Sequence, residues 1–297
     1  MYISFSGFST HEGCGLEYWH GYVNKTKPLD PDNKANSLYG SVVGALFQEF
    51  YDQKLWSNPK TVKSVLVERA ASVLDRIIYK ETKKGNVVDF SKKPSTYQSK
   101  EDLLEAIVEA IPTGLRIIKT HRLLSHDVGT EVVLDQTLRG HKVAGRADFV
   151  LTLEQNKTTI LDGKGSLYRD RYSKPLQLYW YAMLFREIRG VLPDQIGFLY
   201  WRFEPDKALD WIELSESRVD TLRQDVLDTA DRIDLNQRRL DVLSGDEKIS
   251  LRDELFFATP GKNCKFCRYL SICDTGTNYQ RGSDTPFVLG TEEIIGL

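Results

Sequence analysis

The chain has 297 residues, which at about 150 residues per domain allows one large or two modest domains. Hydrophobic residues make up 41% and charged residues 28%, so collagen-like, disordered and disulfide-scaffold classes are excluded. The net charge of −2 gives no overall attraction to nucleic acid, so any such contact must be local. Because no apolar run approaches the ~20 residues of a membrane span and the first residues do not resemble a signal peptide, we expect a soluble, cytoplasmic protein.

The first third of the chain predicts mostly helix. Residues 1–36 show no clear period, and we expect an irregular segment there, with room for a short helix. Apolar residues at helical spacing predict helices over 37–51, 60–79 and 100–118, the last of which Pro112 can break. Residues 81–99 are polar and predict a connecting loop.

The middle of the chain predicts strands. Residues 131–138, 142–153 and 158–162 alternate, are rich in β-branched side chains and are separated by turn signals, which predicts a three-stranded meander. A helical pattern over 174–189, strands over 197–203 and 208–214 and a charged helix over 215–244 follow. We therefore expect a single α/β domain: a mostly helical part over 1–130, a core over 131–214, and a helix with an irregular cysteine-containing segment over 215–297.

Two aspartates stand at the ends of predicted strands, Asp148 in Gly-Arg-Ala-Asp and Asp162 in Leu-Asp-Gly-Lys. Lys164 follows Asp162 by two residues, so in an extended strand both side chains project from the same face. Carboxylates on adjacent strands are suitable ligands for Mg²⁺, which prefers oxygen and keeps several waters. Such an ion polarises a phosphoryl oxygen, and a nearby ammonium can orient the attacking water. The pattern therefore indicates metal-assisted hydrolysis of a phosphodiester.

A plainer interpretation is that each aspartate caps a turn and that Asp162 forms a weak surface pair with Lys164, because D-x-K is a very short pattern. The flanking residues count against it. Asp162 follows an apolar run and Asp148 interrupts another, so both carboxylates would enter a mostly buried sheet. An unpaired charge is costly there.

The next predicted helix carries Gln177 and Tyr181, which are four residues apart and so share one face. An amide and a phenol on that face could reach the edge of the sheet or a phosphate. A polar pair on a helix surface is the simpler alternative.

The segment from Gly145 to Tyr181 resembles the PD-(D/E)XK nucleases of the RecB type. The motifs that carry the resemblance are Gly145-x-x-Asp148, Asp162-Gly-Lys164 and Gln177-x-x-x-Tyr181. The resemblance implies a restriction-endonuclease-like mixed sheet flanked by helices.

The same resemblance implies a role for each motif residue. Asp148 and Asp162 would bind Mg²⁺ or Mn²⁺, and Lys164 would help to activate the attacking water. Gln177 and Tyr181 would support the lysine and contact DNA.

The sequence departs from this family at one place. RecB-like nucleases usually carry a metal-binding histidine in an early helix, in a Gly-x-x-x-His pattern, and here Gly40-Ser-Val-Val-Gly44 has glycine in that place. Water, the backbone carbonyl of Gly163 or the carboxylate of Glu49 could substitute as metal ligand. Glu131, at the start of the first predicted strand, resembles a family glutamate.

Three of the four cysteines cluster near the end of the sequence, as Cys264, Cys267 and Cys273 in C-x₂-C-x₅-C, and Cys14 lies far upstream. Four soft ligands suit an iron-sulfur cluster or tetrahedral zinc, and four unrelated buried cysteines are the alternative. The clustering favours a metal site.

This one-plus-three arrangement resembles the AddB-type and CRISPR-associated RecB-like nucleases, in which four such cysteines hold a [4Fe-4S] cluster. The resemblance implies that the cluster joins the N- and C-terminal segments of the nuclease domain. Zinc stays open as the alternative, because sequence does not distinguish a four-cysteine zinc site from a cluster.

A basic and aromatic stretch beyond the lysine motif predicts the contact with nucleic acid, through Tyr168, Arg169, Arg171 and Lys174. By charge alone it would be a solvated loop. Together with the resemblance, it leads us to expect a Mg²⁺- or Mn²⁺-dependent exonuclease on single-stranded DNA, acting in recombination, repair, replication or CRISPR adaptation. The alternative is a weakly active or inactive DNA-binding partner subunit of a helicase or of a recombination or adaptation complex.

Overall fold

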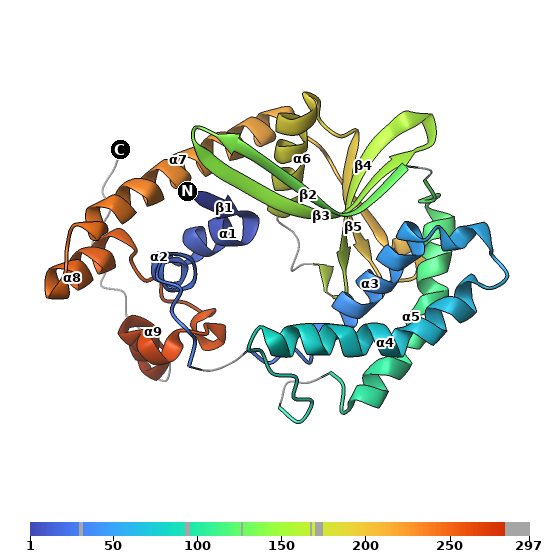
Figure 1. Ribbon diagram of the computed structural model, residues 1–297, viewed down its shortest axis with the longest axis horizontal. Coiled ribbons are helices and arrows are strands. Elements are labelled where there is room, and N and C mark those ends of the chain that lie inside the picture. Colours follow the sequence, from blue (N-terminus) through green and yellow to red (C-terminus); the bar gives the residue numbers. More distant parts are fainter. Residues whose placement is uncertain (30–31, 93–95, 126, 167, 170–174, 283–297) are drawn as a thin grey trace. The chain divides into compact units, whose positions relative to one another are not determined.

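The computed structural model describes residues 1–29, 32–92, 96–125, 127–166, 168–169 and 175–282 (Figure 1). The chain divides into two compact units, one made of residues 1–5 and 32–231 and the other of residues 6–31 and 232–297. Within the described ranges, no helix is long and apolar enough to cross a membrane. The grouping of the whole chain into one nuclease domain stays a prediction.

The first unit is built on a mixed sheet of six strands. The strands are β1 Tyr2–Ser4, β2 Asp127–Leu138, β3 His141–Leu153, β4 Lys157–Lys164, β5 Gln195–Tyr200 and β6 Leu209–Ile212. Their order is β1-β3-β4-β5-β6, with β2 paired along β3. The pairs β2–β3, β3–β4 and β5–β6 are antiparallel, whereas β1–β3 and β4–β5 are parallel. The predicted meander is therefore confirmed as β2, β3 and β4.

A crossover helix joins the two parallel strands β4 and β5, as parallel pairing requires. This helix, α6, spans Leu176–Arg189, and its central residues from Leu178 to Leu184 are buried. It packs against β2, β3, β4 and β5. At Gly145 of β3, an added Cβ would lie 3.2 Å from the Trp180 ring and from Leu184, so α6 approaches the strand closely there.

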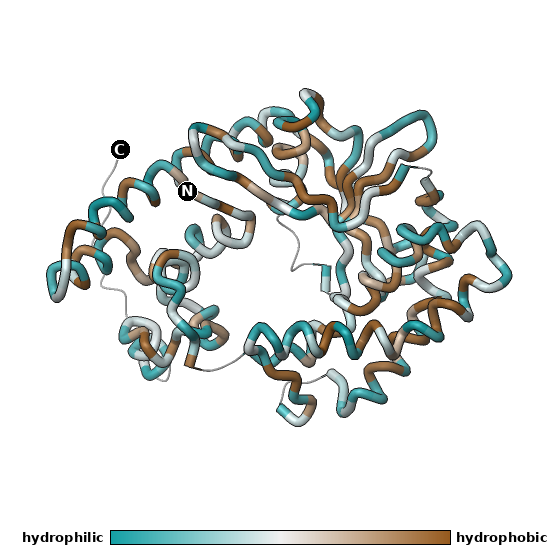
Figure 2. Tube along the Cα trace, viewed as in Figure 1, coloured by the Kyte–Doolittle hydropathy of each residue, from teal (hydrophilic) through white to brown (hydrophobic). Residues whose placement is uncertain are grey.

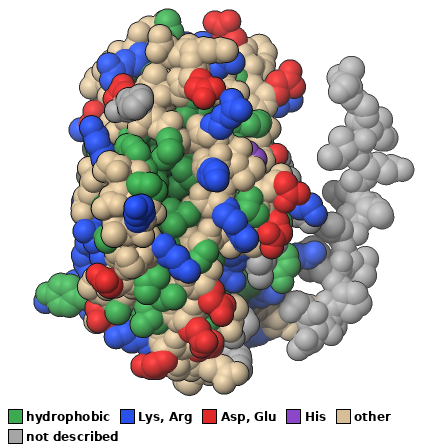
Figure 3. All heavy atoms as spheres, turned by 90° about the vertical axis from the view of Figure 1, so that its right-hand side faces the viewer, with side chains coloured by type: hydrophobic (Ala, Val, Ile, Leu, Met, Phe, Trp, Pro, Cys, Tyr) green, Lys and Arg blue, Asp and Glu red, His purple; other side chains and the backbone are tan. Residues whose placement is uncertain are grey.

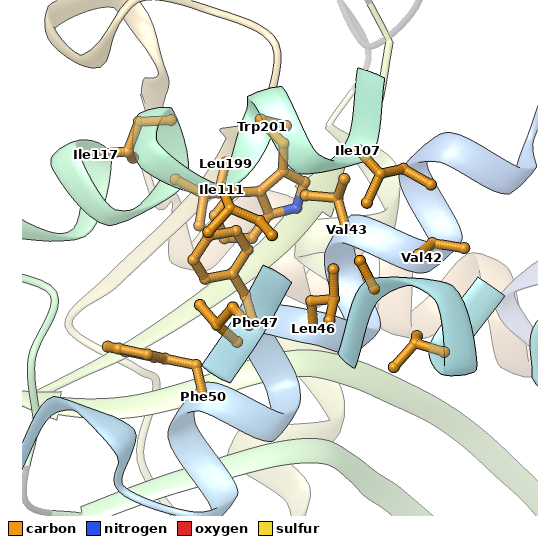
Figure 4. Packing of buried hydrophobic residues seen from close by; sticks show 14 of the residues in the cluster. Val42, Val43, Leu46, Phe47, Phe50, Ile107, Ile111, Ile117, Leu199 and Trp201 are labelled. Atoms are coloured by element: carbon orange, nitrogen blue, oxygen red, sulfur yellow. The ribbon is translucent and has the colours of Figure 1, made fainter. Parts of the chain in front are cut away.

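Three further helices enclose a large apolar cluster against the sheet: α3 Leu38–Asp52, α4 Val62–Lys83 and α5 Lys100–Thr120. Figure 4 shows Phe47 of α3 lying against Trp201, which follows β5, with Ile111 of α5 close by. The Phe47 and Trp201 rings stack with centroids 4.5 Å apart. In Figure 2 the brown, hydrophobic residues gather in the centre of the sheet, where β4 and β5 are largely buried.

Helix α5 runs through Pro112 without ending, which corrects the expectation that this proline can break it. Ser99 caps the helix by accepting a hydrogen bond from Asp102 N. Residues Ile107, Ile111 and others of the same stripe are fully buried in the apolar cluster. That packing offsets the one backbone hydrogen bond that proline removes.

The second unit is helical, which corrects the prediction of irregular structure at both ends of the sequence. Its elements are α1 Phe5–Gly13, α2 Gly15–Tyr18, a π-helical turn Trp19–Val23, α8 Gly245–Leu255 and α9 Asp274–Gly282, together with the end of α7 Glu216–Asp241. Leu16 N donates a 3.3 Å hydrogen bond to Phe257 O, so residues far apart in the sequence pack together here. These helices were missed because they are short, and α1 and α8 also lack a clear apolar stripe.

The surface carries charges of both signs. On the face drawn in Figure 3, Lys and Arg side chains are interspersed with Asp and Glu around hydrophobic patches. This mixture agrees with the net charge of −2 and with the expectation that a contact with nucleic acid is local.

Candidate active site and cysteine site

The two aspartates singled out in the sequence are neighbours on adjacent strands. β3 and β4 pair up to Phe149 opposite Leu161, so the next position sets Asp148 opposite Asp162. Phe149 and Leu161 enter the apolar cluster under α3 and α5. Because side chains alternate along a strand, Asp148 and Asp162 point to the other side of the sheet. Asp162 lies near the end of β4, but Asp148 lies inside β3, which corrects the expectation that both aspartates stand at strand ends. Asp148 Oδ2 accepts a 2.8 Å hydrogen bond from Gly163 N, which ties β3 to the end of β4.

Both carboxylates are buried, and this changes their acidity. Asp162 is 2% exposed. Burial, and then the charge of Asp162, raise the pKa of Asp148 to about 7. Burial also raises the pKa of Asp162, against the opposing charge of Lys164. Two buried carboxylates side by side are costly to ionise without a cation, so the pair fits a divalent ion, which prefers oxygen ligands.

The lysine and the two helix residues form one connected group with the acids. Lys164 Nζ pairs with Asp162 Oδ2 and donates a 3.0 Å hydrogen bond to Gln177 Oε1. Gln177 Nε2 in turn donates a 2.7 Å hydrogen bond to Tyr181 Oη. Burial raises the pKa of Tyr181, so its hydroxyl stays protonated. The structure thus brings together the five residues predicted as catalytic.

A third carboxylate extends the row. The register of β2 on β3 places Glu131 opposite Asp148, and the charge of Glu131 contributes to the raised pKa of Asp148. Glu131 has a φ of 49°, a left-handed conformation that is uncommon outside glycine. Gln48 Nε2 donates to Glu131 Oε1 at 2.7 Å, and Arg146 pairs with Glu131 Oε2 at 3.1 Å. These two contacts hold Glu131 in that conformation.

Two glycines at the end of β4 leave room for close neighbours: Gly165 for helix α3 and Gly163 for Trp201. A Cβ on Gly165, directly after Lys164, would lie 2.4 Å from Gly40 Cα of α3. A Cβ on Gly163 would lie 2.9 Å from Trp201 Nε1. A larger side chain at either position of the β4 end would therefore displace its neighbours.

The position that holds histidine in RecB-like nucleases is open. Gly44 lies between Gly40 and Gln48 on one face of α3, and an added Cβ on Gly44 would meet no atom of the described residues within 4 Å. Glu49, considered as a substitute ligand, instead pairs with Arg69 at 3.4 Å and Arg76 at 2.8 Å. The carboxylate of Glu49 is therefore directed to α4 and does not join the aspartate pair.

Across the described ranges, no three His, Cys, Asp or Glu side chains come together as a site for one metal ion. On the sheet, the candidate metal ligands among these side chains are therefore the two aspartates alone. This suits Mg²⁺, which is usually held by one or two carboxylates and keeps several waters.

Two of the four predicted nucleic-acid contacts can be placed. Tyr168 is 61% exposed. The Arg169 guanidinium lies 5.0 Å from the centre of the Tyr200 ring and 4.7 Å from that of Phe203. Its Nη2 is buried and has no hydrogen-bond partner among the described residues. Arg171 and Lys174 lie outside the described residues.

The four cysteines line a single cavity of about 370 Å³ in the second unit. Three backbone N–H groups point at their sulfurs: Thr259 N to Cys14 at 3.5 Å, Gly261 N to Cys264 at 3.3 Å and Gly276 N to Cys273 at 3.3 Å. Burial raises the pKa of Cys267 to about 11 and also raises that of Cys273. The structure thus gathers all four thiols, including Cys14 from the other end of the sequence.

The sequence did not identify the residues that support the group of Asp148, Asp162 and Lys164. Gln48, Gly165 and Trp201 are identified only by their tertiary contacts with Glu131, Gly40 and Gly163. A glycine directly after Asp162-Gly-Lys164 was the one available signal, and it was too short to interpret.

Two aspartates and a lysine on neighbouring strands of a mixed sheet, with helices on both sides of the sheet, are consistent with a metal-dependent nuclease of the α/β class. A sequence model of the PD-(D/E)XK nuclease superfamily matches residues 2–274. The chain belongs to the PD-(D/E)XK nuclease superfamily.

Two of the solved structures that resemble this chain illustrate how distant the similarity is. A protein from Eubacterium rectale named "Putative exonuclease" is 12% identical with a TM-score of 0.46, covering 90% of this chain and 87% of that one. The protein SSO0001 is 21% identical with a TM-score of 0.25, covering 60% of this chain and 77% of that one. No curated protein matches the sequence. Both structural similarities are too distant to carry an argument about function.

Proposed function

We propose that this chain is a Mg²⁺- or Mn²⁺-dependent deoxyribonuclease that acts as an exonuclease on single-stranded DNA. The observation that carries the proposal is the buried pair of Asp148 and Asp162 on adjacent strands, with Lys164 in contact with the second aspartate. Membership of a nuclease superfamily supports the same reaction class. As in the related family, we propose a place in recombination, repair, replication or CRISPR adaptation.

Asp148, Asp162 and the main-chain carbonyl of Gly163 would hold the divalent ion. When bound, the ion supplies Lewis-acid activation of the phosphodiester and of water. Lys164 is anchored by Asp162 and Gln177, so its ammonium is fixed beside the carboxylates. There it orients the attacking water and neutralises charge that develops on the phosphate.

Gln177 and Tyr181 act as positioning residues in this proposal. A lysine side chain has several rotatable bonds, and ordering it costs up to about 2 kcal/mol of conformational entropy. Two successive hydrogen bonds, between Tyr181 and Gln177 and between Gln177 and Lys164, hold the ammonium in one place before substrate binds. Preorganisation of this kind lowers the activation free energy.

The decisive test is cleavage of end-labelled single- and double-stranded DNA with Mg²⁺ or Mn²⁺. We expect wild-type protein to degrade single strands from an end, and Lys164→Ala to lose that activity while keeping its circular dichroism spectrum. Lys142→Ala, which changes a half-exposed lysine of β3, is the matched control and should cleave normally. Full activity in Lys164→Ala would contradict the site assignment.

A second candidate function is a DNA-binding partner subunit that cleaves weakly, in a helicase or in a recombination or adaptation complex. The open space at Gly44, where related enzymes supply a third protein ligand, favours it. The same assay separates the two functions, because a binding subunit would shift labelled DNA in a gel and leave it intact.

For the cysteine cavity, we propose a structural [4Fe-4S] cluster on Cys14, Cys264, Cys267 and Cys273. Zinc bonds to thiolate at about 2.3 Å, which sets the four sulfurs about 3.8 Å apart around one ion. The four thiols share one cavity, which is the observation that supports a metal group on all four. The cavity accommodates either group, and the resemblance to cluster-bearing RecB-like nucleases is what favours the cluster over zinc.

The cluster proposal is tested by its colour and metal content. Protein purified without oxygen should be brown, contain iron and acid-labile sulfide, and bleach on reduction. Colourless protein with stoichiometric zinc would contradict the cluster and support the zinc alternative. Cys273→Ser should reduce the iron content and the thermal stability together, because the metal would join residues far apart in the sequence.

A further inference from the structure

A cleft of about 270 Å³ lies in the first unit, outside the group of acids and lysine. Helices α3 and α5, the segment before α5 and the turn after β5 form its walls. The lining combines aromatic rings, one guanidinium and two carboxylates, through Tyr39, Tyr97, Arg202, Phe203, Glu109 and Glu204. None of these side chains has a role in the proposed reaction.

One wall of the cleft is a preformed stack. The Arg202 guanidinium lies 3.6 Å from the centre of the Tyr39 ring and 5.6 Å from that of Tyr97, and it donates a hydrogen bond to the Tyr97 hydroxyl. The two rings are nearly parallel, at 14°. Each tyrosine is only 5% exposed, so this wall is rigid. Because the tyrosine rings are covered, the partly exposed Arg202 guanidinium is the flat surface that this wall offers to a base.

The rim of the cleft carries two carboxylates, in contrast to the cationic and aromatic wall. Glu109 and Glu204 are exposed, and neither forms an ion pair with Arg202 or with any other side chain in the described ranges. Carboxylates repel phosphate groups but accept hydrogen bonds from the amino and imino N–H groups of bases. The rim therefore favours the base of a nucleotide over its phosphate.

The cleft adjoins the end of the catalytic strand. A Cβ on Gly165, the residue after Lys164, would lie 3.4 Å from Tyr39 Cδ1. Phe203 also lines the cleft, and the Arg169 guanidinium lies over its ring, 4.7 Å from the ring centre. Gly165 and Arg169, which follow Lys164 in the sequence, thus each lie beside a residue that lines the cleft.

We infer that this cleft takes one unpaired base of the DNA strand being cut, an inference that rests on the proposed nuclease function. Ligand pockets for drug-sized molecules usually measure about 300–1,000 Å³. A cleft of about 270 Å³ lies just below this range, and its size suits a single base. Selection for a base that is free of its partner gives a physical reason for a preference for single strands.

Two variants test the cleft without changing the reacting residues. Phe203→Leu keeps apolar volume and removes the aromatic face, and Ala106→Phe fills the cleft from α5. Both are made in the Lys164→Ala chain, and binding of a short fluorescent single strand is measured by anisotropy, with the matching duplex as comparison. Tyr79→Leu, at a 64% exposed aromatic on α4, is the matched control.

We expect each cleft variant to bind the single strand roughly tenfold more weakly, the loss of about one base stack. Duplex binding and the Tyr79→Leu control should stay unchanged. With Lys164 restored, the cleft variants should raise KM for single strands more than they lower kcat. Unchanged single-strand binding in both folded variants, or an equal loss for duplex, would overturn the inference. Intact DNA with wild-type protein would instead overturn the nuclease function, so the two failures are distinguishable.

Discussion

Asp148→Asn should make the metal-free protein more stable at neutral and alkaline pH while it removes a metal ligand. The Asp148 carboxyl is buried beside Asp162, and its pKa is raised from an ordinary 3.8 to about 7. Asparagine has nearly the same shape and keeps an oxygen that can accept the hydrogen bond from Gly163 N. The substitution therefore removes the cost of a buried charge and little else.

The sign and size of the effect follow from proton linkage. An acid whose pKa rises on folding binds its proton more tightly in the folded state. Its contribution to stability is full below pH 3.8 and is lost as the pH rises through about 7. A pKa of Asp148 that is about three higher in the folded than in the unfolded state corresponds to roughly 4 kcal/mol of unfolding free energy. The asparagine variant escapes that loss, so its advantage should grow between about pH 4 and pH 7.

Urea denaturation with a chelator present, at several pH values from 5 to 8, measures this difference. We expect the advantage of Asp148→Asn to increase by up to about 1.4 kcal/mol per pH unit and to level off above pH 7. Asp135→Asn, the same change at a largely exposed carboxylate, should show no such trend. Mg²⁺ or Mn²⁺ should stabilise the wild type and not the variant. A gap between variant and wild type that is equal at pH 5 and pH 8 would refute the reasoning.

Three further substitutions test other parts of the site. Gly165→Ala brings a Cβ within 2.4 Å of Gly40 Cα, so we expect a loss of about 1–3 kcal/mol in urea denaturation together with slower cleavage; wild-type stability would contradict the close approach. Gly44→His enters open space, so Mn²⁺ binding by calorimetry should tighten and cleavage should quicken; weaker binding would show that the space does not face the ion. Tyr181→Phe removes the acceptor for Gln177, so kcat should fall about tenfold while stability changes by about 1 kcal/mol; an unchanged kcat would remove the positioning role.

Much of the first unit follows from local patterns in the sequence. The alternating strands β2, β3 and β4 and the helices α3, α4, α6 and α7 were all predicted, because each buries one face and so carries its period in the sequence. The three-residue strand β1 was not, since three residues cannot show a period. The helices of the second unit escaped for a similar reason: α1 and α8 have no clear apolar stripe.

Some residues of the candidate site could likewise be predicted from the sequence, and others could not. Asp148, Asp162 and Lys164 were predicted because charged residues inside apolar strands stand out locally. The support of Glu131 by Gln48, 83 positions away, depends on how α3 packs on β2, and no local pattern encodes that. The same holds for the cleft at Arg202, whose aromatic partners come from distant segments.

The central claim, that Asp148 and Asp162 share one divalent ion, is tested most directly by anomalous diffraction from crystals soaked in Mn²⁺. The account predicts one strong peak about 2.0–2.2 Å from a carboxylate oxygen of each aspartate, and the loss of that peak in Asp148→Asn. A peak bound to only one of the two aspartates, or no peak at this end of the sheet, would contradict it.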